Sequence, residues 1–376
     1  MTSWVRTPAE LDALARSLRG AAAVAVDTEA DSLHHYPGKL CLVQIAPPDG
    51  PGVLVDPLAV ADLGALGDLF ADPATVKVLH AADNDLAYFK RLYRFSVGAL
   101  FDTAIAARFL GVTSLSLDGL LRRYLGVEPG KSRQKDDWSR RPLTADQEEY
   151  AVNDVLHLIP LRERLVADLE ALGRLGWVEE ECAALAALGV PDRVVDQDAY
   201  LWLKGTTDLD PRGLAALREL YRARENLALS LDRPPFMIVG NDGLVRLAAL
   251  RPRDAAQVLA VPGCSPSVVR RFGDMILAAV ARAESLPDSD LPVRPRRPRP
   301  SIPAAVRHRA EALREWRTAA CQQFGFEPGL VLPQRLIDRL AADPPGDALA
   351  LAEVDGFRRW RAGLFGEEVL KVLART

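Results

Sequence analysis

The stretch AAAVAVDTEAD, from Ala21 to Asp31, decides the fold. Its first part is a short apolar run of Ala and Val, which predicts a buried strand. Two carboxylates, Asp27 and Glu29, stand at the far end of this strand, and alternate residues of a strand point to the same face. Because two adjacent like charges repel each other, a protein most often keeps such a pair where a divalent cation lies between them. A solvated acidic pair in a turn is the alternative interpretation of this stretch alone.

The composition sets the limits for domain number and cellular location. With 376 residues, 49% of them hydrophobic, the chain is too long for one ordinary core, so two or three domains are expected. The net charge of −4 gives no global nucleic-acid signature, so any such binding has to come from local patches. The four cysteines are far apart, which favours isolated thiols in a reducing compartment. No secretory signal or apolar run of membrane-spanning length is found, and a cytoplasmic protein without membrane contact is expected.

The first half of the chain alternates predicted strands and helices. A second strand is predicted at Leu40–Ala46, and the short turn before it favours an antiparallel hairpin. Further strands are predicted at Val53–Asp56 and Val76–His80, and Ala81–Asp85 opens a helix directly after the last of these. This alternation predicts an α/β domain with a mixed sheet.

A capping box marks the start of a long helix near the middle of the chain. Thr144 is followed three residues later by Gln147, the spacing in which each side chain bonds the other residue's backbone N–H. Tyr150 and Asp154 are four residues apart on this helix and share a face. Pro160 is predicted to kink the same helix.

The second half of the chain predicts helices without strands and contains an internal repeat. The tripeptide Leu217–Glu219 recurs as Leu313–Glu315, and Phe272–Gly273 recurs as Phe365–Gly366. Two copies of this length indicate a duplicated helical module rather than a solenoid, which needs shorter and more numerous repeats. Between the copies, residues 291–300 alternate Pro and Arg, which is typical of a stiff exposed linker.

The acidic residues are ordinary one by one and informative as a set. Asp85 falls in the first turn of its helix, where the helix dipole favours any carboxylate. Tyr150 and Asp154 by themselves could be a buried hydrogen-bonded pair. Together with Asp27 and Glu29, however, they supply the hard oxygen ligands that two Mg²⁺ or Mn²⁺ ions prefer. No cluster of His or Cys in the sequence competes for a softer metal.

At these residues the chain resembles the DEDD superfamily of 3′→5′ exonucleases, which have the ribonuclease H-like fold. Asp27 and Glu29 match the first motif of that superfamily, and Asp85 matches the second. Tyr150 and Asp154 match the third motif in its tyrosine form. The resemblance implies the tyrosine branch of the superfamily.

The resemblance extends to the ribonuclease D family within that superfamily. Glu149 stands where the histidine form of the third motif has its His, and further similar stretches are residues 36–45, 79–86 and 137–143. The helical repeats resemble HRDC modules, two of which follow the catalytic domain in this family, and the second copy is the weaker match. The implied organisation is an exonuclease domain at 1–195, a first HRDC domain at 208–285, a Pro/Arg linker at 286–300 and a second HRDC-like domain at 301–376.

The family implies an activity and a role for each acid. The expected enzyme is a 3′→5′ exoribonuclease that uses two divalent cations, Mg²⁺ or Mn²⁺, and releases nucleoside 5′-monophosphates. Asp27 would bridge both cations, Glu29 and Asp154 would complete the one beside the attacking water, and Asp85 would lie at the other. Tyr150 would orient that water, because a phenol with a pKa near 10 is a poor base. The expected partners are RNA 3′ ends, tRNA precursors above all, and the expected state is a monomer.

Two segments near the acids are candidates for substrate contact. They are Leu33, His34 and Tyr36 in the hairpin, and Lys131, Arg133, Lys135 and Trp138 before the catalytic helix. The hairpin residues could flank the terminal nucleotide, because aromatic side chains stack on bases. The basic segment could contact phosphates, which would make binding depend on salt. Ordinary turn residues and a solvated loop are the alternative interpretations.

Three other functions stay open at this point. A DNA 3′→5′ exonuclease in repair would use the same phosphodiester chemistry, since only contacts to the 2′-hydroxyl separate RNA from DNA. A catalytically inactive nucleic-acid-binding scaffold would rely on the helical modules. A different ribonuclease H-like nuclease would cut internally and release fragments rather than single nucleotides.

Overall fold

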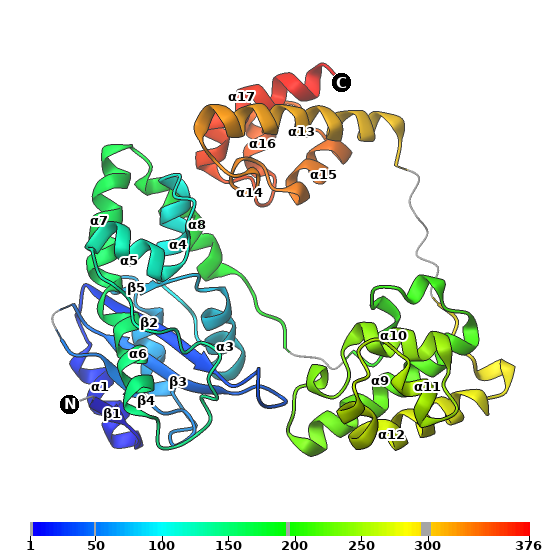
Figure 1. Ribbon diagram of the computed structural model, residues 1–376. Helices are drawn as coiled ribbons and strands as arrows, with labels where there is room; N and C mark the ends of the chain where they lie inside the picture. Colours follow the sequence, from blue (N-terminus) through cyan, green and yellow to red (C-terminus); the bar gives the residue numbers. More distant parts are fainter. Residues whose placement is uncertain (1–2, 49, 193–195, 295–301) are drawn as a thin grey trace.

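The chain forms an N-terminal α/β domain followed by two helical modules (Figure 1). The computed structural model describes residues 3–48, 50–192, 196–294 and 302–376. The Pro/Arg linker predicted at 286–300 lies outside the described residues from position 295 onward. Within the described ranges, none of the helices has the length and apolar character that a membrane span requires.

A six-stranded mixed sheet forms the centre of the first domain. Its strands are β1 (Ser3–Val5), β2 (Ala23–Ala30), β3 (Leu40–Ala46), β4 (Val53–Val55), β5 (Val76–Leu79) and β6 (Leu100–Asp102). The strand order is β1-β4-β3-β2-β5-β6, with β3 antiparallel to both of its neighbours and the other pairs parallel. The predicted hairpin and mixed sheet are confirmed. The three-residue edge strands β1 (SWV) and β6 (LFD) were not predicted, because each has only two apolar residues, whereas the equally short β4 (VLV) is an unbroken apolar run.

The strand that carries the two acids lies in the middle of this sheet, between β3 and β5. Its first half is fully buried, as a run of Ala and Val predicts. The strand continues through both acids, as predicted, because β3 pairs with it past the apolar run, placing Gln44 opposite Asp27 and Leu42 opposite Glu29. Both acids are therefore held by backbone hydrogen bonds within the sheet rather than in a turn.

Among the described residues, nine helical segments complete the first domain. They are α1 (Pro8–Ser17), η1 (Gly64–Leu66), α2 (Gly67–Ala71), α3 (Asp83–Tyr93), α4 (Thr103–Phe109), α5 (Leu117–Leu125), α6 (Ala145–Leu156), α7 (Leu158–Ala171) and α8 (Leu175–Ala187). Helix α6 packs on β2, β3 and β4, and α7 packs on β2 and β5. The single kinked helix predicted here is two helices, which meet at His157. Pro160 explains the break, because it has no N–H to donate and its ring clashes with the carbonyl of Leu156.

The start of α3 is held by a residue from elsewhere in the chain. Asp83 is the first residue inside the helix, and Ala82 occupies the capping position without a side-chain hydrogen bond. The carboxylate of Asp102 accepts hydrogen bonds from the backbone N–H of Ala81 at 3.1 Å and of Ala82 at 2.8 Å. It also accepts from Ala104 at 2.8 Å, so one acid caps α4 and positions α3.

The first helical module has its own core. Its elements are η2 (Ala199–Trp202), η3 (Thr206–Asp208), α9 (Pro211–Leu231), η4 (Pro235–Met237), α10 (Asn241–Leu250), α11 (Ala255–Leu259), α12 (Pro266–Glu284) and η5 (Asp288–Asp290). The second module consists of α13 (Ala304–Phe324), α14 (Pro328–Val331), α15 (Gln334–Ala342), α16 (Ala348–Glu353) and α17 (Arg359–Ala374). The described part of this half contains helices and no strands, as predicted.

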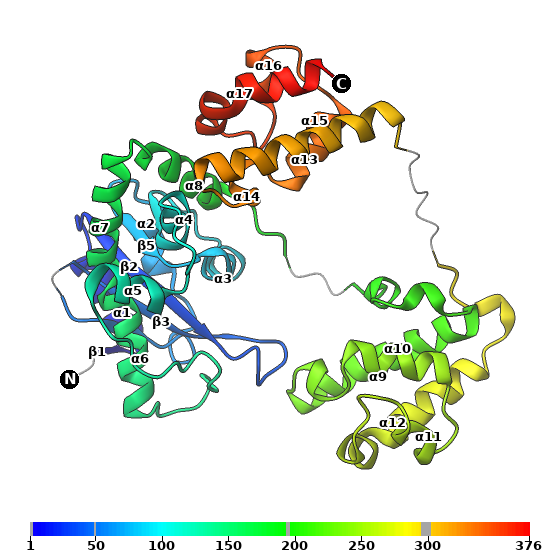
Figure 2. The same cartoon turned by 45° about the horizontal axis from the view of Figure 1, so that its top comes forward.

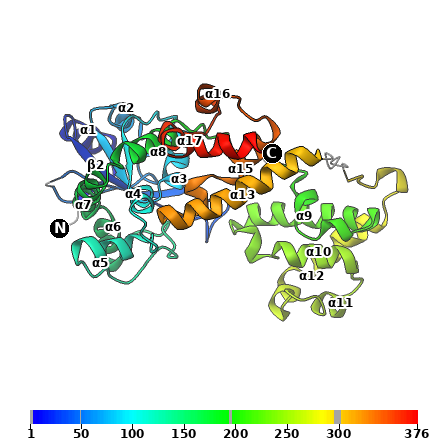
Figure 3. The ribbon, with the colours of Figure 1, turned by 90° about the horizontal axis from the view of Figure 1, so that it is seen from above.

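The two modules contact the first domain at different places (Figures 1, 2 and 3). The second module shares a core with the first domain: Trp177 of α8 stacks on Trp360 of α17 with ring centroids 5.5 Å apart. The first module meets the β2–β3 hairpin, where the hydroxyl of Tyr36 donates a 2.6 Å hydrogen bond to Glu225 of α9. The hairpin that follows the acidic strand therefore reaches the first module.

Candidate active site

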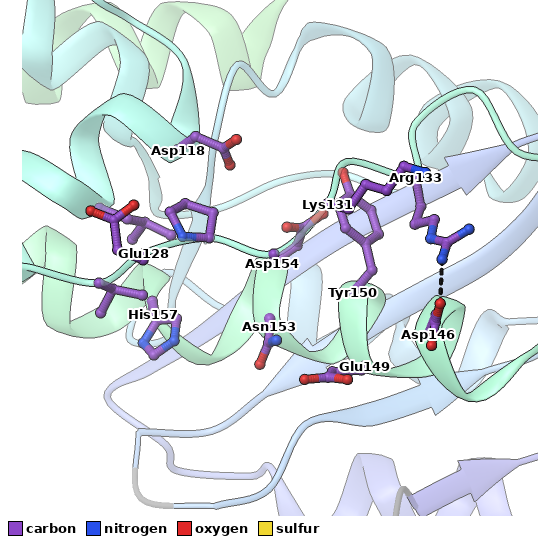
Figure 4. A pocket seen from close by; sticks show the side chains of 14 residues that line it. Asp118, Glu128, Lys131, Arg133, Asp146, Glu149, Tyr150, Asn153, Asp154 and His157 are labelled. Atoms are coloured by element: carbon purple, nitrogen blue, oxygen red, sulfur yellow. Dashed lines mark hydrogen bonds and ion pairs between the residues drawn. The ribbon is translucent and has the colours of Figure 1, made fainter.

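Three carboxylates from two elements converge beside β2. The capping box predicted at Thr144 and Gln147 is present and starts α6, which packs on β2, β3 and β4. Tyr150 and Asp154 then project from one side of α6, as Figure 4 shows. One oxygen each of Asp27, Glu29 and Asp154 lies within 4.8 Å of the others.

The fourth acid lies on the other side of Asp27. Asp85 is 7% exposed and accepts a hydrogen bond from the hydroxyl of Thr28, the residue between the two acids of β2. Asp27 lines two cavities, one of about 390 Å³ with Glu29 and Asp154 and one of about 320 Å³ with Asp85. Asp27 is thus the carboxylate that the two halves of the site have in common.

Burial and mutual repulsion raise the pKa values of these carboxylates. Burial, followed by the charges of Asp85 and Glu29, raises the pKa of Asp27 well above its usual range. Burial and the charge of Asp154 raise the pKa of Glu29 to about 9. Burial raises the pKa of Asp154 to about 7 and that of Asp85 to about 6. A cation placed among them would reverse these shifts, because an opposite charge favours the ionised form.

Tyr150 is a hydrogen-bond donor rather than a base. Burial, and then the charge of Asp154, raises the pKa of its phenol far above the usual value, so it stays protonated at neutral pH. A hydrogen bond between Tyr150 and Asp154 lowers the pKa of the carboxyl and offsets part of the effect of burial. The phenol is therefore a protonated hydrogen-bond donor next to Asp154.

The donor set fits divalent metal ions. All four acids offer carboxylate oxygens, the ligands that Mg²⁺ and Mn²⁺ prefer. Three of them are already within 4.8 Å of one another, and buried anions at such distances need a positive charge for stability. The arrangement can therefore hold cations next to a phosphodiester.

Comparisons with known proteins agree with this site. Residues 2–170 match the family described as 3′-5′ exonuclease, and residues 213–280 and 307–373 match the HRDC domain. The chain is 35% identical over 374 residues to a ribonuclease D of Gluconacetobacter diazotrophicus, which covers 97% of this chain and 91% of the relative. It is 33% identical over 373 residues to a ribonuclease D of Pseudomonas paraeruginosa, with 98% and 97% covered. The chain belongs to the ribonuclease D family.

Solved structures place the fold in the same family. The crystal structure of Escherichia coli RNase D is described as that of an exoribonuclease involved in structured RNA processing. The match covers 100% of this chain and 99% of the Escherichia coli chain, with a TM-score of 0.69 and 27% sequence identity. The predicted fold class is therefore confirmed, and so is the class of enzyme, a 3′→5′ exonuclease of the ribonuclease D type. Exonucleases of this fold use divalent metals, which agrees with the acidic cluster.

The loop before α6 separates two cavities of this ribonuclease D fold. Lys131 and Arg133 line an outer pocket of about 180 Å³ that also contains Tyr150 and Asp154 (Figure 4). The alternate residues Ser132 and Gln134 line the cavity of the acids. Arg133 is ion-paired with Asp146 and Asp136, so part of its charge is already neutralised.

Two of the predicted substrate contacts have other surroundings. Trp138 is fully buried in the cluster under α6, with its ring 6.1 Å from that of Tyr150, which contradicts a contact with nucleic acid. A sequence pattern of basic and aromatic residues cannot separate an exposed ring from one that packs under a helix. Tyr36 is packed against the first HRDC domain rather than beside the acids.

The other candidates in these segments connect the hairpin to the loop. The imidazole Nε2 of His34 lies 2.8 Å from the backbone oxygen of Lys135. Its neighbour His35 contacts Ser139 of the same loop at 2.9 Å. Leu33 is 43% exposed at the start of the hairpin. The hairpin and the loop are thus joined to each other at the edge of the site.

Sequence reasoning missed several residues of the site. Asp118 lines the cavity of the acids and raises the pKa of Asp154. Gln44 is fully buried opposite Asp27, and its side-chain amide has no hydrogen-bond partner within the described residues. Thr28 holds Asp85. The predicted hairpin could have indicated Gln44, because pairing its two strands places Gln44 opposite Asp27. Nothing in the sequence indicates Asp118, because its position at the acids depends on tertiary packing.

Proposed function

We propose that this chain is a 3′→5′ exoribonuclease that hydrolyses phosphodiester bonds with two divalent cations and releases nucleoside 5′-monophosphates. The observation that carries the proposal is the convergence of one oxygen each of Asp27, Glu29 and Asp154 within 4.8 Å. Asp85 lines a neighbouring cavity together with Asp27. When bound, two such cations supply an activated water and a counter-charge for the leaving 3′ oxygen. Mg²⁺ and Mn²⁺ are the candidates, because both take hard oxygen ligands.

Each of the four acids would hold one or both of the cations. Asp27 would be shared by both, since it lines both cavities. Glu29 and Asp154 would hold the cation beside the attacking water, and Asp85 would hold the other. Tyr150 would donate its proton in a hydrogen bond that orients the attacking water, because its raised pKa excludes it as a base.

Contacts to the substrate come from the loop and the hairpin. Lys131 and Arg133 would contact phosphates from the outer pocket beside the acids. Lys135, which is exposed on the same loop, would add long-range attraction, and Leu33 and His34 would flank the terminal nucleotide. Binding would then weaken as salt increases.

We further propose 3′-end processing of structured RNA, including tRNA precursors, as the role of the enzyme. The ribonuclease D of Escherichia coli is described as involved in structured RNA processing, and its structure covers this whole chain. We propose that the enzyme acts as a cytoplasmic monomer. The four cysteines, all of them free, agree with a reducing compartment. The domain limits at 1–195, 208–285, 286–300 and 301–376 are part of the proposal.

The proposal is tested by digestion of a 3′-extended tRNA, with the products identified. Mg²⁺ or Mn²⁺ should support stepwise shortening and the release of nucleoside 5′-monophosphates, whereas EDTA should abolish both. Fragments rather than single nucleotides would indicate an internal nuclease, and binding without degradation would indicate a scaffold. Paired RNA and DNA oligomers of one sequence distinguish the exoribonuclease from a DNA exonuclease, and light scattering tests the monomer.

A further inference from the structure

Another cavity, outside the acidic site, lies at the junction of the hairpin and the first HRDC domain. Its volume is about 530 Å³, within the range of ordinary small-ligand sites. Tyr36 and Pro37 form its wall on the side of the hairpin, and Tyr221 and Leu229 form the apolar wall on α9. The cavity thus combines side chains of two domains, and none of these residues belongs to the acidic site.

Hydrogen bonds fix the two walls relative to each other. The hydroxyl of Tyr36 donates to Glu225 of α9 at 2.6 Å, and the backbone N–H of Tyr36 donates to Asp232 at 3.1 Å. The imidazole of His35 contacts the other oxygen of Asp232 at 2.7 Å. Asp232 is itself the left-handed residue that ends α9, so the hairpin is bonded to both the side and the end of this helix.

The lining suits a flat, neutral group that carries hydrogen-bonding edges. Tyr36 and Tyr221 offer ring surface from two domains, and Leu229 extends the apolar part. Gln197 and Asn226 offer amides, which donate and accept at the same time. A nucleobase has these two features, a stacking face and polar edges, and single-stranded RNA is commonly recognised through both.

One further residue of the lining favours a ligand that carries a phosphate, that is, a nucleotide rather than a free base. Arg222 is exposed at the cavity, one turn before Asn226 on α9. Its guanidinium can pair with a phosphate beside a base held in the cavity. The face of α9 that lines the cavity therefore offers a ring, an amide and a positive charge, and the carboxylate of Glu225 on the same face is already bonded to Tyr36 and Arg224.

We propose that this cavity binds an unpaired nucleotide of the RNA, upstream of the 3′ end that lies at the acids. The inference rests on the proposed exoribonuclease function. The chain from Glu29 to Tyr36 can span at most about 25 Å, at roughly 3.6 Å per residue, which limits the distance between the two sites. A strand of several nucleotides covers that distance, whereas a dinucleotide occupies the acids alone. The cavity therefore gives the enzyme a preference for longer single-stranded 3′ ends.

The test compares hydrolysis of single-stranded oligoadenylate RNAs of increasing length, from two to twelve nucleotides, with Mn²⁺ present. The first variant is Arg222→Ala with Asn226→Ala, because both side chains are exposed and their loss leaves the core of the domain intact. The second is Tyr221→Leu, which removes the ring and keeps an apolar side chain. Arg253→Ala is the matched control, an exposed Arg of the same domain outside the cavity.

Each outcome decides one question. We expect kcat/KM of the wild type to rise with length, and each cavity variant to lose about fivefold or more on the dodecamer, the range expected for one stacked base. The dinucleotide should be cleaved equally by all four proteins. If the variants match the wild type at every length, or if they lose as much on the dinucleotide, the cavity is not a nucleotide site and the proposed function stands. If the wild type cleaves none of the RNAs, the proposed function fails, and this inference fails with it.

Discussion

The carboxylate of Asp85 accepts a hydrogen bond from the hydroxyl of Thr28, the residue that separates Asp27 from Glu29 on β2. This bond ties Asp85 to the strand that carries Asp27 and Glu29, and Asp85 lines one cavity together with Asp27, whose pKa its charge raises. The same strand thereby positions three of the four acids, two by carrying them and one by bonding it.

Replacing Thr28 by Val should therefore impair Asp85 without removing any acid. The hydrogen bond lowers the pKa of Asp85, which burial raises to about 6, so its loss should raise that pKa and shift the acidic limb of the rate profile to higher pH. We expect kcat to fall roughly tenfold near pH 6, since bonds to charged groups contribute about 1.5–3 kcal/mol. The measurement is a pH profile of RNA hydrolysis. Thr28→Ser keeps the hydroxyl and should retain the wild-type profile, and an unshifted profile of the Val variant would show that the bond has no role.

Neutralising one acid of the cluster should lower the activity and, in the absence of metal, raise the thermal stability. Asp27→Asn and Asp154→Asn should each nearly abolish hydrolysis while RNA binding is kept. In EDTA the same changes should raise Tm by a few degrees, because they remove repulsion among buried carboxylates and about 1 kcal/mol shifts Tm by roughly 2–4 °C in a domain of this size. Hydrolysis assays and thermal unfolding measure the two effects. Glu163→Gln, an exposed acid of α7, is the control and should change neither. Wild-type activity of either Asn variant would refute the assignment of the cluster.

The metal-free protein should lose stability as pH rises. The folded protein has pKa values of about 6 for Asp85, about 7 for Asp154 and about 9 for Glu29, whereas the unfolded chain has values near 4. The folded state therefore binds more protons than the unfolded state above pH 4, and the free energy of unfolding falls from there up to about pH 9. Thermal unfolding in EDTA at pH 5 and pH 8 checks the direction, with Asp27→Asn expected to show a smaller decrease. Mn²⁺ should raise Tm more at pH 8 than at pH 5, and the opposite order would exclude the acids as the metal site.

Tyr150→Phe should lower turnover less than the loss of an acid. The phenol donates a hydrogen bond and its raised pKa keeps it protonated, so the variant loses one oriented donor and no charge. We expect kcat to fall by roughly 10–100-fold, with little change in the amount of bound Mn²⁺. Steady-state kinetics and Mn²⁺ titration measure the two quantities. An unchanged rate would remove Tyr150 from the mechanism, and lost metal would make it a structural residue.

The first domain shows which parts of the fold a sequence can specify. The buried strand with Asp27 and Glu29, the hairpin and the capping box of α6 follow from local patterns, and the structure contains all three. Asp102 is different, because its role at the start of α3 depends on the spatial neighbourhood of two helices. Local patterns therefore predict the elements that carry the acids but not the contacts that position them.

The surroundings of the site show the same limit. A basic segment with an aromatic residue indicates nucleic-acid contact, yet Trp138 is buried while Lys131 and Arg133 line a pocket. The hairpin residue Tyr36 contacts a domain that begins well over a hundred residues later in the chain. No periodicity within the hairpin can indicate so distant a partner, because burial of a loop residue is decided by tertiary structure.

The contact between α8 and α17 allows a prediction about the second HRDC domain. The carboxylate of Glu181 accepts hydrogen bonds from Trp360 Nε1 at 2.9 Å and from the guanidinium of Arg361 at 3.2 Å. Arg361 is only 4% exposed, and burial lowers the pKa of its guanidinium, so this cation depends on Glu181 for its counter-charge. A buried ion left without its partner is strongly destabilising.

Glu181→Gln should therefore destabilise the docked second domain while the site at Asp27 is left intact. The amide keeps the shape of the side chain but removes the charge. We expect the free energy of unfolding to fall by roughly 2–3 kcal/mol, less than for a fully buried pair because Glu181 is 20% exposed. Urea unfolding measures this change, and Glu179→Gln, an exposed acid of the same helix, is the control. Equal stability of the two variants would mean that the stacked rings of Trp177 and Trp360 hold the domains together without the ion pair.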